Sequence, residues 1–314
     1  MAEPTGQGTL QHLGSLTTMR LKHGSYSLAG AAGSGVLNNT PITVSYLVIA
    51  GGGSGGAHQA GGGGAGGYRN SYASETSGAN SATRTPLSLL TGASYLVTVG
   101  AGGPSVGVSE APGVSGNPSV FSSVTTVGGG GGERYINPHV NFNPGQNGGS
   151  GGGGSSSQAP SSVGALSLGT PLEGHGGGGG WLGCCLFGGG AGGGAGGAGG
   201  NGTGAGDRSV AGIGLASLIT GSSITRGVGG RGGIYPTEVT GPNGTDNYGN
   251  GGQGTGTGGY ASGGGGKGVV ILRWLTTQGT ILLGAGLFSA AGVLTSGGDS
   301  YVEITTGTGN VSWS

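Results

Sequence analysis

Residues 188–200 read GGGAGGGAGGAGG, a stretch of thirteen residues without a side chain larger than a methyl group. Such a stretch cannot fold by burying apolar side chains, so backbone hydrogen bonds must hold it if it is ordered. The physical candidate is an extended helix with three residues per turn and a rise of about 3.1 Å, which would span about 40 Å. Every third residue from Gly190 to Gly202 is glycine, which predicts a bare edge for a neighbouring strand. A valine at Gly196 is therefore expected to collapse local order.

The composition limits the classes of protein that this chain can belong to. Glycine supplies 90 of the 314 residues, against an ordinary usage of about 7%. Ten basic and ten acidic side chains leave no basic excess for binding a nucleic acid duplex or a membrane surface. Flexible disorder is the structural alternative, since glycine-rich linkers behave as random coils. Compact β-branched strands at intervals argue against it.

Neither processing signals nor disulfides are expected to shape the fold. The first residues, MAEPTGQG, lack the basic and apolar regions of a secretory signal. Apolar runs stay well short of the length of about 18 residues that a membrane span needs. Cys184 and Cys185 are adjacent, so they cannot join distant parts of the chain.

Short β-branched strands beside glycine clusters suggest three parts. The four clearest strands are expected at residues 42–50, 94–99, 119–127 and 268–275. The first and last of them bracket almost all the glycine clusters, so we predict that they pair and close the domain at its base. This divides the chain into an N-terminal attachment segment at 1–40, a glycine-rich domain at 41–278 and a small C-terminal β module at 279–314.

Turn and hairpin signals complete the predicted organisation. Asn-Gly dipeptides begin at Asn147, Asn201, Asn243 and Asn250, where glycine runs are expected to reverse. Residues 299–313, DSYVEITTGTGNVSW, alternate like a hairpin around residues 307–309. Glycine runs separated by turns predict rods that stack in antiparallel fashion.

The sequence contains only incomplete motifs for catalysis and cofactor binding. Residues 46–56, YLVIAGGGSGG, open like a dinucleotide-binding unit, but glycines at 61–64 would break the helix that must follow. Lys267 precedes glycine, whereas a phosphate-binding loop needs serine or threonine there. The histidines show no paired ligand spacing, and the carboxylates form no recognisable acid/base pair. We therefore expect no enzyme activity, no cofactor and no metal site.

Aromatic residues beside the glycine clusters are the candidate binding residues. Residues 181–187, WLGCCLF, form either a plug over the end of the glycine rods or an exposed tip that grips another surface. Two inserts with aromatics and proline, 133–147 and 234–250, are better candidates for recognition, unless they merely fold back on the rods. The candidate side chains are Tyr135, His139, Phe142, Trp181, Tyr235 and Tyr248.

Several blocks occur in a characteristic order: YLVIAGGGSGG at 46–56, GGGGAGGY at 61–68, SYLVTVGAGG at 94–103 and GGGGKGVVILRW at 263–274. This series resembles the glycine-rich domain of bacteriophage tail-fibre proteins and distal tail adhesins, over about residues 42–275. The resemblance implies a mainly β or irregular fold in which strands frame a sandwich of packed polyglycine II helices. It also implies that variable loops between the helices touch a bacterial receptor.

The expected function is that of a tail fibre or tail-tip adhesin, a non-enzymatic virion protein located outside the cell. Its partners would be other tail or fibre proteins and a bacterial surface polysaccharide or outer-membrane protein, with no nucleic acid. A homotrimer is one arrangement in keeping with the resemblance. The first alternative is a structural virion protein, such as a fibre shaft, collar or decoration subunit, without receptor contact. The second is a secreted cell-wall protein, which should carry a signal peptide.

Overall fold

The structure is a computed structural model that describes residues 40–107, 111–135, 145–156, 165–182, 187–203, 207–236 and 239–314. It also describes the backbone of four two-residue strands, in which β1 pairs with β2 and β3 pairs with β4: β1 His12–Leu13, β2 Leu16–Thr17, β3 Arg20–Leu21 and β4 Gly24–Ser25. This part of the chain is mainly β with antiparallel sheets and no α-helix, as predicted. Within it, no helix has the length and apolar character to cross a membrane.

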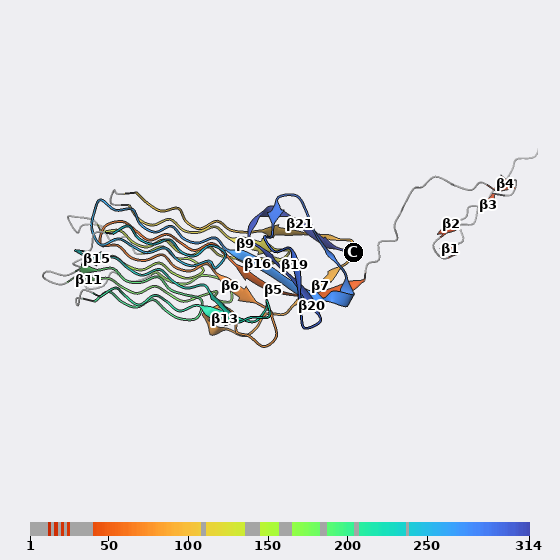
Figure 1. Cartoon of the computed structure of the whole chain (residues 1–314), viewed down its shortest axis with the longest axis horizontal. Coiled ribbons are helices and arrows are strands. Elements are labelled where there is room, and N and C mark those ends of the chain that lie inside the picture. Colours follow the sequence, from red (N-terminus) through yellow and green to blue (C-terminus); the bar gives the residue numbers. More distant parts are fainter. Residues whose placement is uncertain are drawn as a thin grey trace, which may run out of the picture.

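Two six-stranded sheets form a β-sandwich at one end of the described molecule (Figure 1). The first sheet has the order β19 Val293–Ser296, β20 Asp299–Ile304, β16 Val269–Leu275, β5 Pro41–Ile49 and β6 Tyr68–Asn70, with β7 Leu87–Leu90 also on β5. The second has the order β10 Val124–Thr126, β9 Ser119–Phe121, β8 Ser94–Thr98, β21 Thr306–Trp313 and β17 Ile281–Leu283, with β18 Leu287–Phe288 also on β21. Two 3₁₀ turns, η1 Gly78–Asn80 and η2 Thr276–Gln278, complete this end.

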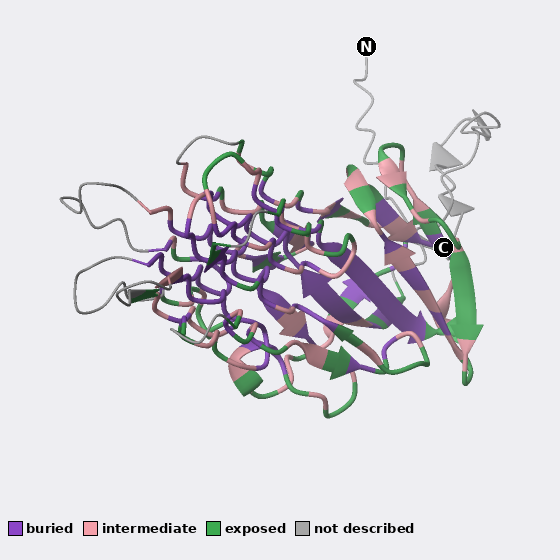
Figure 2. Cartoon of the chain, turned by 60° about the vertical axis from the view of Figure 1, so that its left-hand side comes forward, coloured by how far each residue is buried: buried purple, intermediate pink, exposed green. Residues whose placement is uncertain are grey.

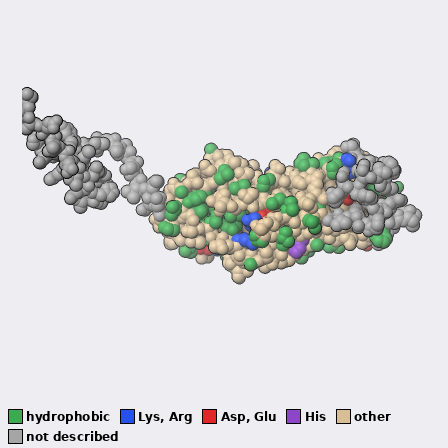
Figure 3. Space-filling view, turned by 180° about the vertical axis from the view of Figure 1, so that it is seen from behind, with side chains coloured by type: hydrophobic (Ala, Val, Ile, Leu, Met, Phe, Trp, Pro, Cys, Tyr) green, Lys and Arg blue, Asp and Glu red, His purple; other side chains and the backbone are tan. Residues whose placement is uncertain are grey.

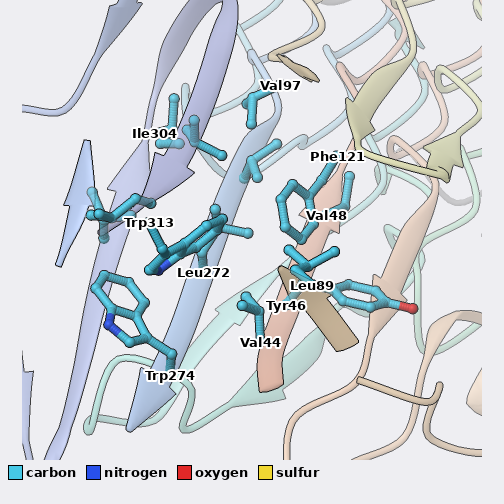
Figure 4. Close-up of a cluster of buried hydrophobic side chains, with 14 of the residues drawn as sticks. Val44, Tyr46, Val48, Leu89, Val97, Phe121, Leu272, Trp274, Ile304 and Trp313 are labelled. Carbon is cyan, nitrogen blue, oxygen red and sulfur yellow. The ribbon is translucent and has the colours of Figure 1, made fainter. Parts of the chain in front are cut away.

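The β-sandwich has an apolar core because its strands alternate in polarity. Side chains at every second position of β5, from Ile42 to Val48, face the second sheet and are buried. Trp274 of the first sheet meets Trp313 of the second edge to face, with ring centroids 5.8 Å apart (Figure 4). The β-sandwich therefore has a conventional apolar core beside the glycine-rich part of the fold.

The strands that bracket the glycine clusters pair as predicted. β5 and β16 run antiparallel, with Ile49 opposite Val269 and Ser45 opposite Arg273. The sheets also continue across the predicted boundary after residue 278, because β20 pairs with β16 and β21 pairs with β8.

The predicted hairpin at 299–313 is wrong. β20 and β21 lie in different sheets, and Thr305 alone carries the chain from one sheet to the other. β20 instead forms a hairpin with β19 around Gly297 and Gly298, both with positive φ. Alternating polarity suits a hairpin and a crossing between sheets equally well, so the sequence pattern did not distinguish them.

Residues 60–67 run through the middle of the glycine clusters, and their N–H groups donate hydrogen bonds with a period of three. Successive N–H groups turn to three different tracts, and every third one returns to the same tract. The acceptor carbonyls lie in residues 249–255, 127–133 and 190–193, at N···O distances between 2.7 and 3.1 Å. This tract therefore bonds to neighbours on several sides rather than in the single plane of a sheet.

The carbonyl groups of residues 60–67 accept hydrogen bonds from three further tracts, which are residues 50–56, 150–153 and 230–233. Every residue of 60–67 is buried, and Figure 2 shows most of the tract backbone as buried. We call the hydrogen-bonded tracts between residues 50 and 268 the glycine lattice. Its interior is filled by backbone, and an added Cβ at Gly63 would lie less than 3.0 Å from the Gly53 carbonyl.

The composition of residues 188–200 predicted one straight rod of about 40 Å. This prediction is wrong, because the stretch reverses in the structure. The backbone bends over residues 195–197, where the Gly194 N–H donates to the Gly197 carbonyl at 2.9 Å. The Ala191 N–H donates to the Gly200 carbonyl at 2.9 Å, so the two halves lie side by side. A glycine-alanine sequence gives no side-chain signal for the reversal.

The four Asn-Gly dipeptides are not the turns that we predicted. None of the four asparagines has the positive φ that a type I′ turn requires. Their side-chain Oδ1 atoms instead accept backbone N–H groups of neighbouring tracts: Asn147 from Leu166, Asn201 from Gly179, Asn243 from Gly264 and Asn250 from Val228. The side-chain oxygen of each asparagine thus acts as the hydrogen-bond acceptor for a backbone N–H group, as backbone carbonyls do elsewhere in the lattice.

Candidate functional site

A small aromatic sheet lies at the end of the glycine lattice remote from the β-sandwich, which we call the loop end (Figure 1). It consists of β11 Trp181–Leu182, β12 Phe187–Gly188 and β15 Ile234–Tyr235, all antiparallel. Its strands continue directly into lattice tracts, because the Gly189 N–H donates to the Gly233 carbonyl at 2.9 Å. The lattice tracts therefore determine where these aromatic residues lie.

The aromatic side chains of this sheet are partly exposed. Trp181 is 50% exposed and lies opposite Gly188, which has no side chain to cover the indole. On the other face, Phe187 lies opposite Tyr235, with ring centroids 5.4 Å apart and an edge-on angle of 65°. Tyr235 is 36% exposed, so both faces of the sheet offer an aromatic surface.

Tyr135 forms a second aromatic group where tract 50–56 turns into tract 60–67. Its N–H donates to the His58 carbonyl at 3.2 Å, and the two rings meet edge to face at 5.2 Å. His58 and Gln59 both have positive φ, which reverses the chain between the two tracts. The His58 N–H donates to the Thr255 hydroxyl at 2.9 Å. Tyr135 is thus held against His58, which is itself bonded to Thr255.

Glu133 is a buried carboxylate beside Tyr135. Its side chain accepts the Ser155 N–H at 3.0 Å and so joins the chain segment at residue 133 to the one at residue 155. Burial raises the pKa of Glu133 to about 7, and hydrogen bonds from Ser155 oppose the shift. The group therefore titrates near neutral pH.

Tyr248 does not join the other candidate aromatics. Its carbonyl accepts the Gly227 N–H, and its ring lies 5.4 Å from the guanidinium of Arg226. Arg226 pairs with Glu303 of β20, which places Tyr248 at the β-sandwich end. The insert 234–250 is therefore not one loop, since its middle runs back along the lattice and bonds to residues 261–264.

The remaining predictions on the site concern His139, Phe142 and metals. His139 and Phe142 lie outside the described residues. In the ranges that the structure describes, no three His, Cys, Asp or Glu side chains are grouped to hold a metal ion. Sequence reasoning passed over His58 and Glu133. The signal for His58 was the short AHQA break between two glycine runs, because a break of that length must be the reversal.

A comparison with known families addresses the glycine-rich part of the chain. The profile of the glycine-rich domain matches residues 25–275, which is most of the 314 residues. The chain belongs to this glycine-rich domain family. The whole lattice, both aromatic groups at the loop end and strands β5 and β16 lie inside the matched range. No curated protein and no solved structure matches the chain.

Proposed function

We propose that the tracts of the glycine lattice are polyglycine II helices. The period of three in the donors of residues 60–67 supports this, because such helices have three residues per turn and no internal hydrogen bonds. Neighbours on several sides also suit a helix whose polar groups point outward. Backbone bonds at about 0.5–1.5 kcal/mol net each would then replace an apolar core in this part of the fold.

We further propose that the protein is a tail fibre or tail-tip adhesin of a bacteriophage, in which the glycine lattice presents a receptor-binding surface. The observation that carries this proposal is the partly exposed aromatic sheet at the loop end, with Trp181 and Tyr235 at its surface. Aromatic side chains give large contact areas at low entropic cost and dominate binding hot spots. The receptor would be a bacterial surface polysaccharide or outer-membrane protein.

The mechanism is geometric. Chain segments leave the lattice from tracts whose ends are fixed by backbone hydrogen bonds, so their sequences can diverge without unfolding the scaffold. The β-sandwich stands at the opposite end, where β5 begins directly after Thr40. That end would join the virion, and several copies per particle would convert modest affinity into avidity.

The test is the binding of labelled protein to a panel of bacterial strains. Trp181→Ala combined with Tyr235→Ala should abolish binding to a susceptible strain, while the thermal midpoint stays close to that of the unaltered protein. Phe288→Ala is the control, because Phe288 is an aromatic residue on the β-sandwich that is even more exposed than Trp181 and Tyr235. Equal binding by all three proteins would contradict the proposed surface.

A second experiment separates an adhesin from a structural virion protein. Residues 133–147 and 234–250 are exchanged for the corresponding segments of a relative with another host. An adhesin should change its pattern of bound strains, because the exchanged segments contain Tyr135 and Tyr235. An unchanged pattern after both exchanges would favour a fibre shaft, collar or decoration subunit.

A further inference from the structure

Two arginines stand together on neighbouring tracts of the glycine lattice. Arg208 begins one tract and Arg231 lies in the next, and the two tracts are joined where the Gly232 N–H donates to the Ser209 hydroxyl at 2.9 Å. Arg231 is exposed and Arg208 is half-buried. In a chain with ten basic residues, two neighbouring guanidinium groups are a substantial local concentration of charge.

Neither arginine forms an ion pair with a described carboxylate, although other cations in the chain do. The pairs are Arg69–Glu173, Arg226–Glu303, Lys267–Asp246 and Arg273–Asp299. Asp207 directly precedes Arg208 but pairs with neither arginine. Burial lowers the pKa of Arg208, and the charge of Arg231 lowers it further, so the two cations are close enough to repel each other.

Gln253 adds a third donor to the same place. Its Oε1 atom accepts a hydrogen bond from Arg208 Nη1 at 3.1 Å, which turns the amide toward the guanidinium. The next residue, Gly254, donates its N–H to the Arg231 carbonyl at 2.9 Å. The amide NH₂ of Gln253 and the free N–H groups of both arginines therefore form a surface of donors.

We propose that Arg208, Arg231 and Gln253 bind an oxyanion, a phosphate or carboxylate group carried by a bacterial surface polymer. Guanidinium groups suit such anions because they donate two parallel hydrogen bonds with fixed geometry. Arg231 precedes Tyr235 by four residues, about 12 Å along an extended tract, so one polymer can contact both the charged and the aromatic groups. This inference rests on the proposed receptor binding and adds the chemical class of the ligand.

The test is a titration of the purified full chain with inorganic phosphate and, separately, with acetate, followed by NMR of the arginine side chains. Saturable shifts are expected for Arg208 and Arg231, with affinity falling as salt is added. Arg231→Gln should weaken binding about tenfold or more, and the double variant with Arg208→Gln should abolish it. Lys267→Gln is the control, since Lys267 is an exposed cation already paired with Asp246.

Stronger binding of phosphate than acetate would assign the site to phosphorylated polymers, and the reverse would assign it to polymers rich in uronic acids. Shifts that do not saturate, or that keep the same affinity in Arg231→Gln, would overturn the proposal. Cell binding separates this result from the proposed function. If both arginine variants bind cells normally while the Trp181 and Tyr235 variant does not, the result contradicts the proposed anion site and supports the proposed aromatic surface.

Discussion

The Oδ1 atom of Asn250 accepts a hydrogen bond from the backbone N–H of Val228 at 2.9 Å, in the position that a glycine carbonyl fills elsewhere in the lattice. Asn250→Ala leaves that N–H without its partner, and we expect a loss of about 1–3 kcal/mol in unfolding free energy. Chemical denaturation would measure it. Asn310→Ala is the control, because Asn310 is exposed on β21. Equal losses in the two variants would contradict this role.

Gly63 should be among the positions least tolerant of any side chain. An added Cβ there would lie less than 3.0 Å from the Gly53 carbonyl, in a lattice that is bonded on several sides. We expect Gly63→Ala to lower stability by several kcal/mol or to prevent folding, as overpacked cores do. Gly107→Ala is the matched control, since nothing lies within 4 Å of its added Cβ. Similar thermal midpoints for both variants would disprove close backbone packing.

Glu133 should make stability fall as pH rises. Its pKa increases from 4.5 to about 7 on folding, so the folded chain holds a proton that the unfolded chain releases between these values. The shift corresponds to about 3 kcal/mol by pH 7. Glu133→Gln removes this cost and should exceed the unaltered protein in stability above neutral pH, but not near pH 4.5. Denaturation curves across pH 4.5 to about 8 test this, and parallel pH profiles would contradict it.

Removal of residues 279–314 should unfold the whole protein rather than detach a module. The deletion takes away β20 beside β16 and β21 beside β8, and it exposes the face of Trp274 that contacts Trp313. Loss of a buried tryptophan alone costs about 3–5 kcal/mol. Circular dichroism and solubility would follow the outcome. A truncated chain that still melts cooperatively would show instead that residues 279–314 form a separate unit.

The sequence was most informative where side chains determine the structure. The alternating apolar residues of β5 and the apolar run of β16 predicted both strands, and their positions at the two ends of the glycine clusters predicted their pairing. Trp181 was chosen as a candidate binding residue for the same reason, because it is conspicuous among glycines.

Prediction failed where backbone hydrogen bonds, rather than side chains, determine the structure. Nothing in the composition of residues 188–200 marks the bend at 195–197, since glycine and alanine fit a straight tract and a reversal equally well. The same holds for Asn243 and Asn250, whose side chains suit a turn or a bond to a neighbouring tract. Tyr248 was assigned to the binding loops because the sequence does not reveal that its insert returns along the lattice, where backbone bonds and the Asn243 side chain hold it.

The direction of the lattice tracts has a mechanical consequence. The tracts run lengthwise between the β-sandwich and the aromatic sheet, with hydrogen bonds crossing between them (Figure 1). If the protein were held at the β-sandwich and pulled at the loop end, the force would load many hydrogen bonds between tracts in shear at the same time. The bonds would not open one by one. Figure 3 shows few charged side chains on one face of this body, so little of that resistance would depend on the ionic strength of the surroundings.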